Sequence, residues 1–237
     1  MIIGISGYAK SGKDTVAKII QYINRKESGI DYTLEDALKD DGHDFILDME
    51  SRWVVKKFSN ALKKIASLLT GIPERMFEDQ KFKESFLGSE WHTPINTPLD
   101  DAFDDVQFVK MMSVREFLQK LGTDAVRDNL HPNAWVNAAM ANYQPQFSGV
   151  DANGSPVYQL PNWIFTDCRF PNEAKAIKDR GGFIIRIDRP GIGPVNNHPS
   201  ETALDDWDFD YKIANVSDME SLKQTVQLVM SKIWQTN

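Results

Sequence analysis

Two glycines, two lysines and four oxygen-bearing side chains stand close together near the amino terminus, in Gly7-Tyr-Ala-Lys10-Ser-Gly12-Lys13-Asp-Thr15. Glycines at both ends of such a loop let the chain curl so that successive N–H groups point inward, where they can hold a phosphate. Lys13 adds a mobile positive charge suited to β- and γ-phosphates. Lys10 and Ser11 lie inside the same loop. The chemistry that this spacing favours is the binding of a nucleotide triphosphate tail.

The segments around the loop are those needed to position it. The apolar run at residues 2–5 predicts a buried strand. After the loop, apolar residues recur at helical spacing, at Val16, Ile19, Ile20 and Ile23. Strand, glycine loop, lysine and helix in this order are the context of a P-loop, and the new helix adds its positive end as an anion site. The alternative is an ordinary glycine-rich turn before a helix.

One position departs from the usual P-loop pattern. Asp14 stands where Ser or Thr commonly holds Mg²⁺, and Thr15 follows it. A carboxylate also suits this hard cation, directly or through water. Residues 163–167 predict a second strand that ends in Asp167, which is typical of the P-loop element whose carboxylate meets Mg²⁺. We therefore predict Mg²⁺ near Asp14, Thr15 and Asp167. A plain helix cap is the alternative for Asp167.

A second set of side chains suits the phosphate that accepts the transferred group. Ser113 and Glu116 form a capping box that begins a helix, on which Arg115 and Gln119 share one face. Arg supplies a fork for a phosphate, and Gln can address a base edge or bond a phosphate. Lys63, near the start of another helix, opposes the helix dipole, which an anionic ligand would explain. For each of these residues alone, an exposed polar surface is the alternative. The residues predicted to bind the acceptor are Lys10, Lys63, Lys83, Arg115, Gln119, Asp124, Arg127, Trp135, Asp167 and Arg169, of which Arg115, Asp167 and Arg169 are also predicted, with Lys13, to be catalytic.

Three other side chains suggest structural roles. Trp135 lies in a predicted apolar helix at 134–143, where a place in the core is favoured over a base-stacking platform. His198 has no His or Cys partner at the spacing of a metal ligand set, so a metal site there is not expected. We expect this segment to act as a lid or cap instead. Cys168 is expected to be structural.

The remaining pattern predicts an alternation of strands and helices. Further strands are expected at 53–58, 181–187 and 211–215. A helix with its apolar face at Leu62, Ile65, Ala66 and Leu69 should start at Ser59 or Asn60. Gly122 should end the helix that starts at Ser113. Other helices are expected from Pro171 and, after a capping box at Ser217, over the apolar positions Leu222, Val226, Val229 and Ile233. We expect a helix-and-loop excursion at 31–50, a substrate-covering element at 73–96, an exposed loop at 96–106 and a connecting loop or turn at 144–161.

Composition limits the function classes. The chain has 237 residues, a net charge of −7 and Cys168 as its only cysteine. The acidic balance argues against nonspecific nucleic-acid binding, and a single cysteine allows no internal disulfide, which fits a cytoplasmic location. No signal peptide or membrane span is expected. One domain is predicted, with a core at 1–72 and 162–237 and a substrate-binding and lid insertion at about 73–161. An apolar stripe can face a second copy as readily as a core, so a homodimer stays open.

Taken together, several segments resemble the bacteriophage deoxynucleoside monophosphate kinases. They are Ser11–Thr15, Phe58–Lys63, Val114–Asp124, Trp135-Val136, Thr166–Glu173, Arg189–Gly191, His198-Pro-Ser-Glu201 and Ile213–Asn215. The resemblance accounts for Asp14, since that family carries Asp there. It implies an α/β P-loop NTPase fold: a three-layer sandwich with a mostly parallel central sheet, flanking helices, and helical substrate-binding and lid insertions. It also implies phosphoryl transfer from ATP to a deoxynucleoside 5′-monophosphate, in the host cytoplasm if the chain is phage-encoded.

Two rival functions remain at the level of sequence. One is a dephospho-coenzyme A kinase-like activity, which shares the fold and a glycine-rich loop. The other is a nucleotide-gated switch with slow hydrolysis and a protein partner. The guanine motif Asn-Lys-x-Asp of GTPases is absent from the sequence, which disfavours a guanine switch.

Overall fold

The computed structural model describes residues 1–25, 33–39, 51–94, 109–195, 198–216 and 218–236. The chain divides into two compact units, the first formed by residues 1–58 with 136–237 and the second by residues 59–135. These limits differ from the 73–161 expected for an insertion, and the substrate-binding role of that insertion stays a prediction. The loop expected at 96–106 lies outside the described residues. So does the 31–50 excursion, apart from 33–39, which contain the short helix α2 (Leu34–Lys39).

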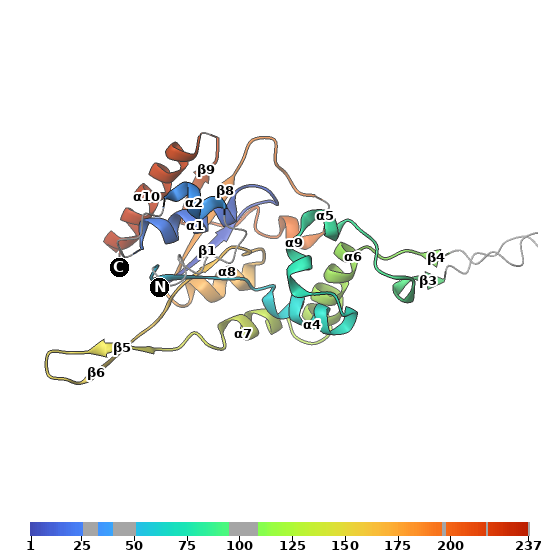
Figure 1. Cartoon of the computed structure of the whole chain (residues 1–237), viewed down its shortest axis with the longest axis horizontal. Coiled ribbons are helices and arrows are strands. Elements are labelled where there is room, and N and C mark those ends of the chain that lie inside the picture. Colours follow the sequence, from blue (N-terminus) through green and yellow to red (C-terminus); the bar gives the residue numbers. More distant parts are fainter. Residues whose placement is uncertain (26–32, 40–50, 95–108, 196–197, 217, 237) are drawn as a thin grey trace, which may run out of the picture. The chain divides into compact units, whose positions relative to one another are not determined.

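A five-stranded parallel sheet forms the centre of the first unit (Figure 1). In spatial order its strands are β2 (Trp53–Lys56), β7 (Asn162–Phe165), β1 (Ile2–Ser6), β8 (Phe183–Asp188) and β9 (Tyr211–Ala214). Each was expected, with ends that differ by a few residues. Because all pairings are parallel, the carboxyl ends of the strands meet at one edge, where open α/β sheets bind ligands.

Alternation along β1 gives this sheet two buried faces. Ile3 and Ile5 pack in one core with α1 (Lys13–Ile23) and α10 (Met219–Thr236). Ile2 packs in the other core with α8 (Pro171–Lys178) and with the last part of α7 (Ala134–Met140). Figure 1 shows α1 and α10 on one side of the sheet and α8 on the other, so the predicted three-layer sandwich is confirmed.

Helix α10 also confirms the apolar positions predicted for the closing helix. Leu222, Val226, Val229 and Ile233 are all buried. Ser217, which was expected to begin its capping box, lies outside the described residues. None of the helices that the structure describes has the length and apolarity to cross a membrane.

The second unit is a cluster of short helices around an aromatic core. Its elements are α4 (Asn60–Thr70), η1 (Glu74–Glu78), α5 (Gln80–Lys83), η2 (Ser89–Trp91), the pair β3 (Thr93–Pro94) and β4 (Val109–Lys110), α6 (Val114–Gln119) and the π-helical η3 (Lys120–Asp128). Phe77 and Phe117 are buried at its centre, with Phe82 and Trp91 packed against them. Of the aromatic side chains in the segment expected to cover substrate, Phe77, Phe82 and Trp91 therefore help to build the core of this unit, whereas Phe86 is exposed.

The apolar face predicted for α4 is wrong in part. Ala66 is buried, but Ile65 is 37% and Leu69 53% exposed. The buried polar residue on this helix is Lys63, which has an acidic partner. A periodicity argument counts apolar side chains and does not foresee that a paired lysine occupies the inner face.

Gly122 does not end its helix, contrary to expectation. The chain continues without a break from α6 into η3. A side chain at Gly122 would come within 3.1 Å of Leu62, and the Gly122 carbonyl oxygen accepts a 2.8 Å hydrogen bond from Trp135 Nε1. This glycine therefore serves a close approach rather than a helix stop.

The connecting loop expected at 144–161 contains an antiparallel hairpin, β5 (Gln146–Val150) with β6 (Pro156–Gln159). Asp151 Oδ1 closes its turn by accepting from the N–H groups of Asn153 and Ser155, at 2.8 and 2.9 Å. The Asn153-Gly154 pair is a known hairpin signal. It was predicted as part of a connecting loop or turn, but the two strands beside it were not predicted.

Gly182 offers a test of how closely β8 is packed. A Cβ there would lie 2.6 Å from the Ile2 carbonyl oxygen and 2.9 Å from that of Ile177, and neither backbone atom can move cheaply. We expect Gly182→Ala to lower the free energy of unfolding by about 1–3 kcal/mol, measured by urea denaturation. Gly193→Ala is the matched control, since a Cβ there meets nothing within 4 Å. Equal stabilities for the two variants would contradict this packing.

Candidate active site

The loop between β1 and α1 has the backbone of a phosphate cradle. Gly7, Lys10 and Gly12 all have positive φ, at 145°, 66° and 104°. A side chain at Gly7 would lie 2.5 Å from the Ile187 carbonyl oxygen. Both glycines are therefore required by conformation, and Gly7 by space as well.

Asn215, directly after β9, holds the other side of this loop. Its Nδ2 donates to the Ser11 carbonyl oxygen at 2.9 Å and stands 2.6 Å from where a Gly12 Cβ would be. The sequence placed Asn215 within a segment of resemblance, but no role was predicted for it. Its signal is positional, because the residue after a parallel strand lies at the ligand-binding edge.

Lys13 is folded into the loop that it follows. Its Nζ donates to the carbonyl oxygens of Gly7 and Tyr8, both at 2.7 Å. Burial and, to a smaller extent, the positive charge of Arg169 lower the pKa of Lys13 to about 8, against the carboxylates of Asp14, Glu201 and Asp167, which raise it. These five side chains are therefore electrostatic neighbours, and four of them were predicted to act together.

Two observations at the loop test whether a nucleotide fits it. Ser11 Oγ is buried and, among the residues that the structure describes, has no hydrogen-bond partner. The first N–H groups of a helix, here those of α1, have no partner within the helix. Together with Lys13 these donors form a site suited to phosphate oxygens.

The carboxylates nearby suit a magnesium ion that is shared with a ligand. The Asp14 side chain is 71% exposed. Within the described ranges, no group of three or more His, Cys, Asp or Glu could hold a metal ion. Mg²⁺ is commonly bound by one or two carboxylates, with waters and substrate phosphates completing its shell. Asp14, Thr15 and Asp167 fit that arrangement.

The segment after β7 is fixed by two carboxylates. Asp167 Oδ1 accepts the backbone N–H of Phe58 at 2.8 Å, which joins the ends of β7 and β2. Glu173 Oε2 accepts the backbone N–H groups of Arg169 and Phe170, at 2.8 and 3.1 Å. Cys168 is buried between them, and burial raises the pKa of its thiol well above the ordinary value. A nucleophilic role for Cys168 is thereby disfavoured, in line with the structural role expected for it.

A polar cluster that includes the loop residue Tyr8 was missed by the sequence reasoning. The Tyr8 hydroxyl donates to Asp205 at 2.9 Å, and the Arg186 guanidinium lies 4.6 Å from the centre of the Tyr8 ring. Arg186 also pairs with Asp188 at 3.0 Å and with Asp205 at 3.2 Å. The cluster ties the tip of the loop to β8 and to the segment after α9 (Pro199–Thr202).

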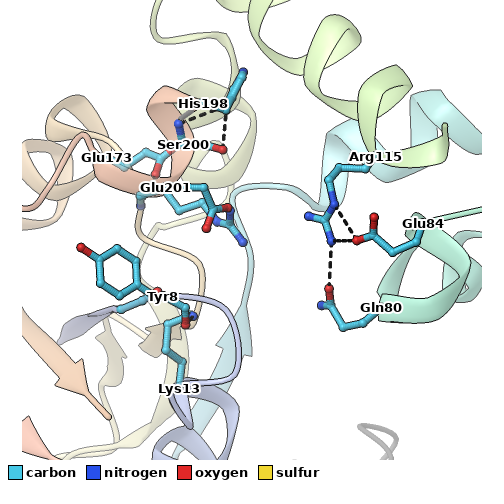
Figure 2. Close-up of polar contacts among 11 residues, drawn as sticks. Tyr8, Lys13, Gln80, Glu84, Arg115, Glu173, His198, Ser200 and Glu201 are labelled. Atoms are coloured by element: carbon cyan, nitrogen blue, oxygen red, sulfur yellow. Dashed lines mark hydrogen bonds and ion pairs between the residues drawn. The ribbon is translucent and has the colours of Figure 1, made fainter. Parts of the chain in front are cut away.

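Two cations of the second unit are paired with glutamates. The Lys63 ammonium, with its side chain 9% exposed, contacts Glu78. Arg115 donates from Nε to Glu84 at 2.9 Å, and its Nη2 contacts Glu84 and Gln80 (Figure 2). The exposed surface considered for Lys63 is excluded by its burial.

The other predicted acceptor residues are spread over several elements. Gln119 is one turn from Arg115 on α6, Lys83 ends α5, and Asp124 and Arg127 lie in η3. Trp135 is 6% exposed and its indole N–H is bonded to Gly122, so its place in a core is confirmed. The action of these residues on a substrate stays a prediction.

Comparison with known proteins identifies the family. Residues 42–226 match the family model described as deoxynucleotide monophosphate kinase. The chain belongs to the deoxynucleotide monophosphate kinase family. It is therefore an enzyme of the phosphotransferase class, and the resemblance stated from the sequence is confirmed.

Viral relatives of this kinase carry the same family name. The deoxynucleotide monophosphate kinase of Enterobacteria phage T4 is 25% identical over 255 residues, which cover 93% of this chain and 95% of the relative. A protein of Acanthamoeba polyphaga mimivirus is 30% identical over 156 residues, covering 64% and 69%. The kinase of Escherichia phage RB69 is 26% identical over 118 residues, covering 50% and 45%.

The lowered pKa of Lys13 predicts a pH dependence for nucleotide binding by this kinase. Above about pH 8 the lysine of the unliganded loop loses its proton, and with it the charge that attracts phosphate. A bound triphosphate would raise that pKa, so affinity should fall with rising pH. We expect the Kd for ATP to rise roughly tenfold between about pH 8 and pH 9.5, measured by calorimetry. Lys13→Met should bind weakly with no such trend, and a Kd of the wild type that stays flat over this range would contradict the assignment.

Proposed function

We propose that this kinase transfers the γ-phosphoryl group of ATP to a deoxynucleoside 5′-monophosphate, with Mg²⁺ as the metal ion. The observation that carries the proposal is the charge cluster of Lys13, Asp14, Asp167 and Arg169 at the carboxyl edge of the sheet. Such a cluster beside a P-loop supplies what phosphoryl transfer requires, namely positioning and neutralisation of charge.

On the donor side, the loop from Gly7 to Thr15 would hold the β- and γ-phosphates through its N–H groups. Lys13 would exchange its two carbonyl partners for phosphate oxygens. Each hydrogen bond would then be stronger, because a phosphate oxygen is a charged acceptor and a carbonyl oxygen is a neutral one. Mg²⁺, when bound near Asp14, Thr15 and Asp167, would neutralise charge on these phosphates. Arg169 would face the group in transfer.

On the acceptor side, Lys63, Lys83, Arg115 and Arg127 supply candidate partners for the monophosphate. Arg115 is the strongest candidate, because its planar fork can take two phosphate oxygens at once. The acceptor phosphate is already anionic, so no general base is needed to activate it. Asp167 could orient the attacking oxygen. Lys10 would contact the phosphates, and Gln119 would contact the base. A homodimer, a cytoplasmic location and the absence of nucleic-acid binding stay predictions.

The test of the proposed function is an ADP-release assay across all ribo- and deoxyribonucleoside monophosphates, with dephospho-coenzyme A included. We expect release that depends on a deoxynucleoside monophosphate and on Mg²⁺. Lys13→Met should lower kcat by at least about 10²-fold, because it removes a charge that stabilises the transition state, while thermal unfolding stays close to that of the wild type. Release stimulated only by dephospho-coenzyme A, or by no small acceptor, would overturn the proposal.

Arg115→Ala tests the acceptor side separately. We expect the KM for the monophosphate to rise about 10-fold or more, the loss of a charged hydrogen bond, while the KM for ATP changes less than about 3-fold. Arg75→Ala is the matched control, since it removes an arginine from the same unit at an exposed position for which no role is proposed. Equal effects of Arg115→Ala on both KM values would remove Arg115 from the acceptor site.

A further inference from the structure

The His198-Pro-Ser-Glu201 segment has no part in the proposed function, yet local hydrogen bonds fix its backbone. Pro199 occupies the first turn of α9, a position that suits its fixed φ. His198 Nδ1 accepts the backbone N–H of Ser200 at 3.2 Å, and the Glu201 N–H donates to the His198 carbonyl oxygen at 2.9 Å. This single turn fixes the backbone from which Glu201 projects, and the Glu201 side chain is only 4% exposed.

Glu201 is directed at Arg169, which is one of the predicted catalytic residues. Its Oε1 accepts from Arg169 Nη1 at 2.9 Å. Glu173 meanwhile holds the backbone N–H of Arg169 (Figure 2 shows Glu173 and Glu201). One glutamate therefore fixes the main chain of Arg169 and the other its guanidinium.

This ion pair leaves most of the arginine's hydrogen-bonding capacity for a ligand. A guanidinium has five N–H donors. In the part of the chain that the structure describes, Glu201 is the side chain that pairs with it, and the Arg169 side chain is 39% exposed. Within this pair the Glu201 carboxylate is therefore buried, whereas the Arg169 guanidinium remains partly exposed to solvent.

Such a pair is a poor means of stabilising the fold by itself. Burying a carboxylate costs solvation free energy that one ion pair does not always recover. A guanidinium that is more than a third exposed gains little in return. The arrangement is better suited to fixing the direction of a cation than to holding the chain together.

We propose that Glu201 is a positioning residue that holds Arg169 so that its remaining N–H donors meet the phosphoryl group in transfer. This inference rests on the role that the proposed function gives to Arg169.

The first test is a double-mutant cycle on the rate of a single turnover. We expect Glu201→Gln to lower that rate about 10-fold, because it removes a charge-assisted hydrogen bond. Glu201→Asp keeps the charge on a shorter side chain and should lower the rate less. In the Arg169→Ala background, Glu201→Gln should change the rate less than about 2-fold, because a residue that acts through Arg169 has nothing left to position. Additive effects would overturn the proposal, and so would an Arg169→Ala variant with the rate of the wild type.

Asp179→Asn is the control for the loss of a carboxylate in general. Asp179, the residue that follows α8, pairs with Lys175 of that helix, and its side chain is 54% exposed. It should leave the turnover rate unchanged. Thermal unfolding of each variant checks that the fold is kept, and a drop in rate that followed the melting temperature across all variants would count against positioning.

A binding measurement separates this inference from the proposed function. ATP carries the phosphoryl group that Arg169 would contact, and ADP does not. By calorimetry, Glu201→Gln should weaken the binding of ATP about 10-fold relative to that of ADP, as Arg169→Ala should. Equal weakening of both nucleotides would overturn the positioning role. If the wild type transferred no phosphoryl group to any monophosphate, the proposed function would fall, and the ratio of ATP to ADP affinity would still decide whether Glu201 positions Arg169.

Discussion

The structure depends on keeping an ammonium group charged where little water reaches it. Burial and the positive charge of Arg169 both disfavour the proton of Lys13. The chain compensates in two ways: two carbonyl oxygens accept from the ammonium, and carboxylates surround it at a greater distance. The phosphate oxygens of a bound triphosphate would stabilise the Lys13 ammonium more strongly than these groups do. The energetic cost of burying the ammonium in the unliganded loop would therefore favour binding of the ligand.

The rest of the first unit serves to hold that loop still. Four strand ends converge on it: β1 leads into it, β7 supplies Asp167, the end of β8 leaves no room for a side chain at Gly7, and β9 delivers Asn215. A parallel sheet brings these ends together without any local sequence signal, because its pairing is set by the buried strands. The loop is therefore positioned by the core, and its own residues need only permit the required backbone angles.

This division explains what could be predicted from the sequence. The strands, the glycine loop, α1 and the acid after β7 all have local signatures, and all were found. Pairings across long separations have none: Glu201 with Arg169 and Asp205 with Tyr8 join residues far apart in the chain. In the second unit the failures have a common cause. Gly122 and the inner face of α4 were assigned by rules for isolated helices. Tertiary neighbours decide both: Leu62 lies against Gly122, and Glu78 pairs with the buried Lys63 of α4.

A common logic links the cations of both units. Each of the four cations with the strongest claim on a phosphate already has an oxygen partner within its own unit: carbonyls for Lys13, and Glu201, Glu78 and Glu84 for Arg169, Lys63 and Arg115. The three carboxylates differ in burial. Glu201 is 4% exposed, whereas Glu78 and Glu84 are 47% and 62% exposed. An exposed carboxylate can leave a cation for water at little cost, but a buried one cannot. In the proposed function, phosphate would therefore displace Glu78 and Glu84 from their cations, whereas Glu201 would stay with Arg169.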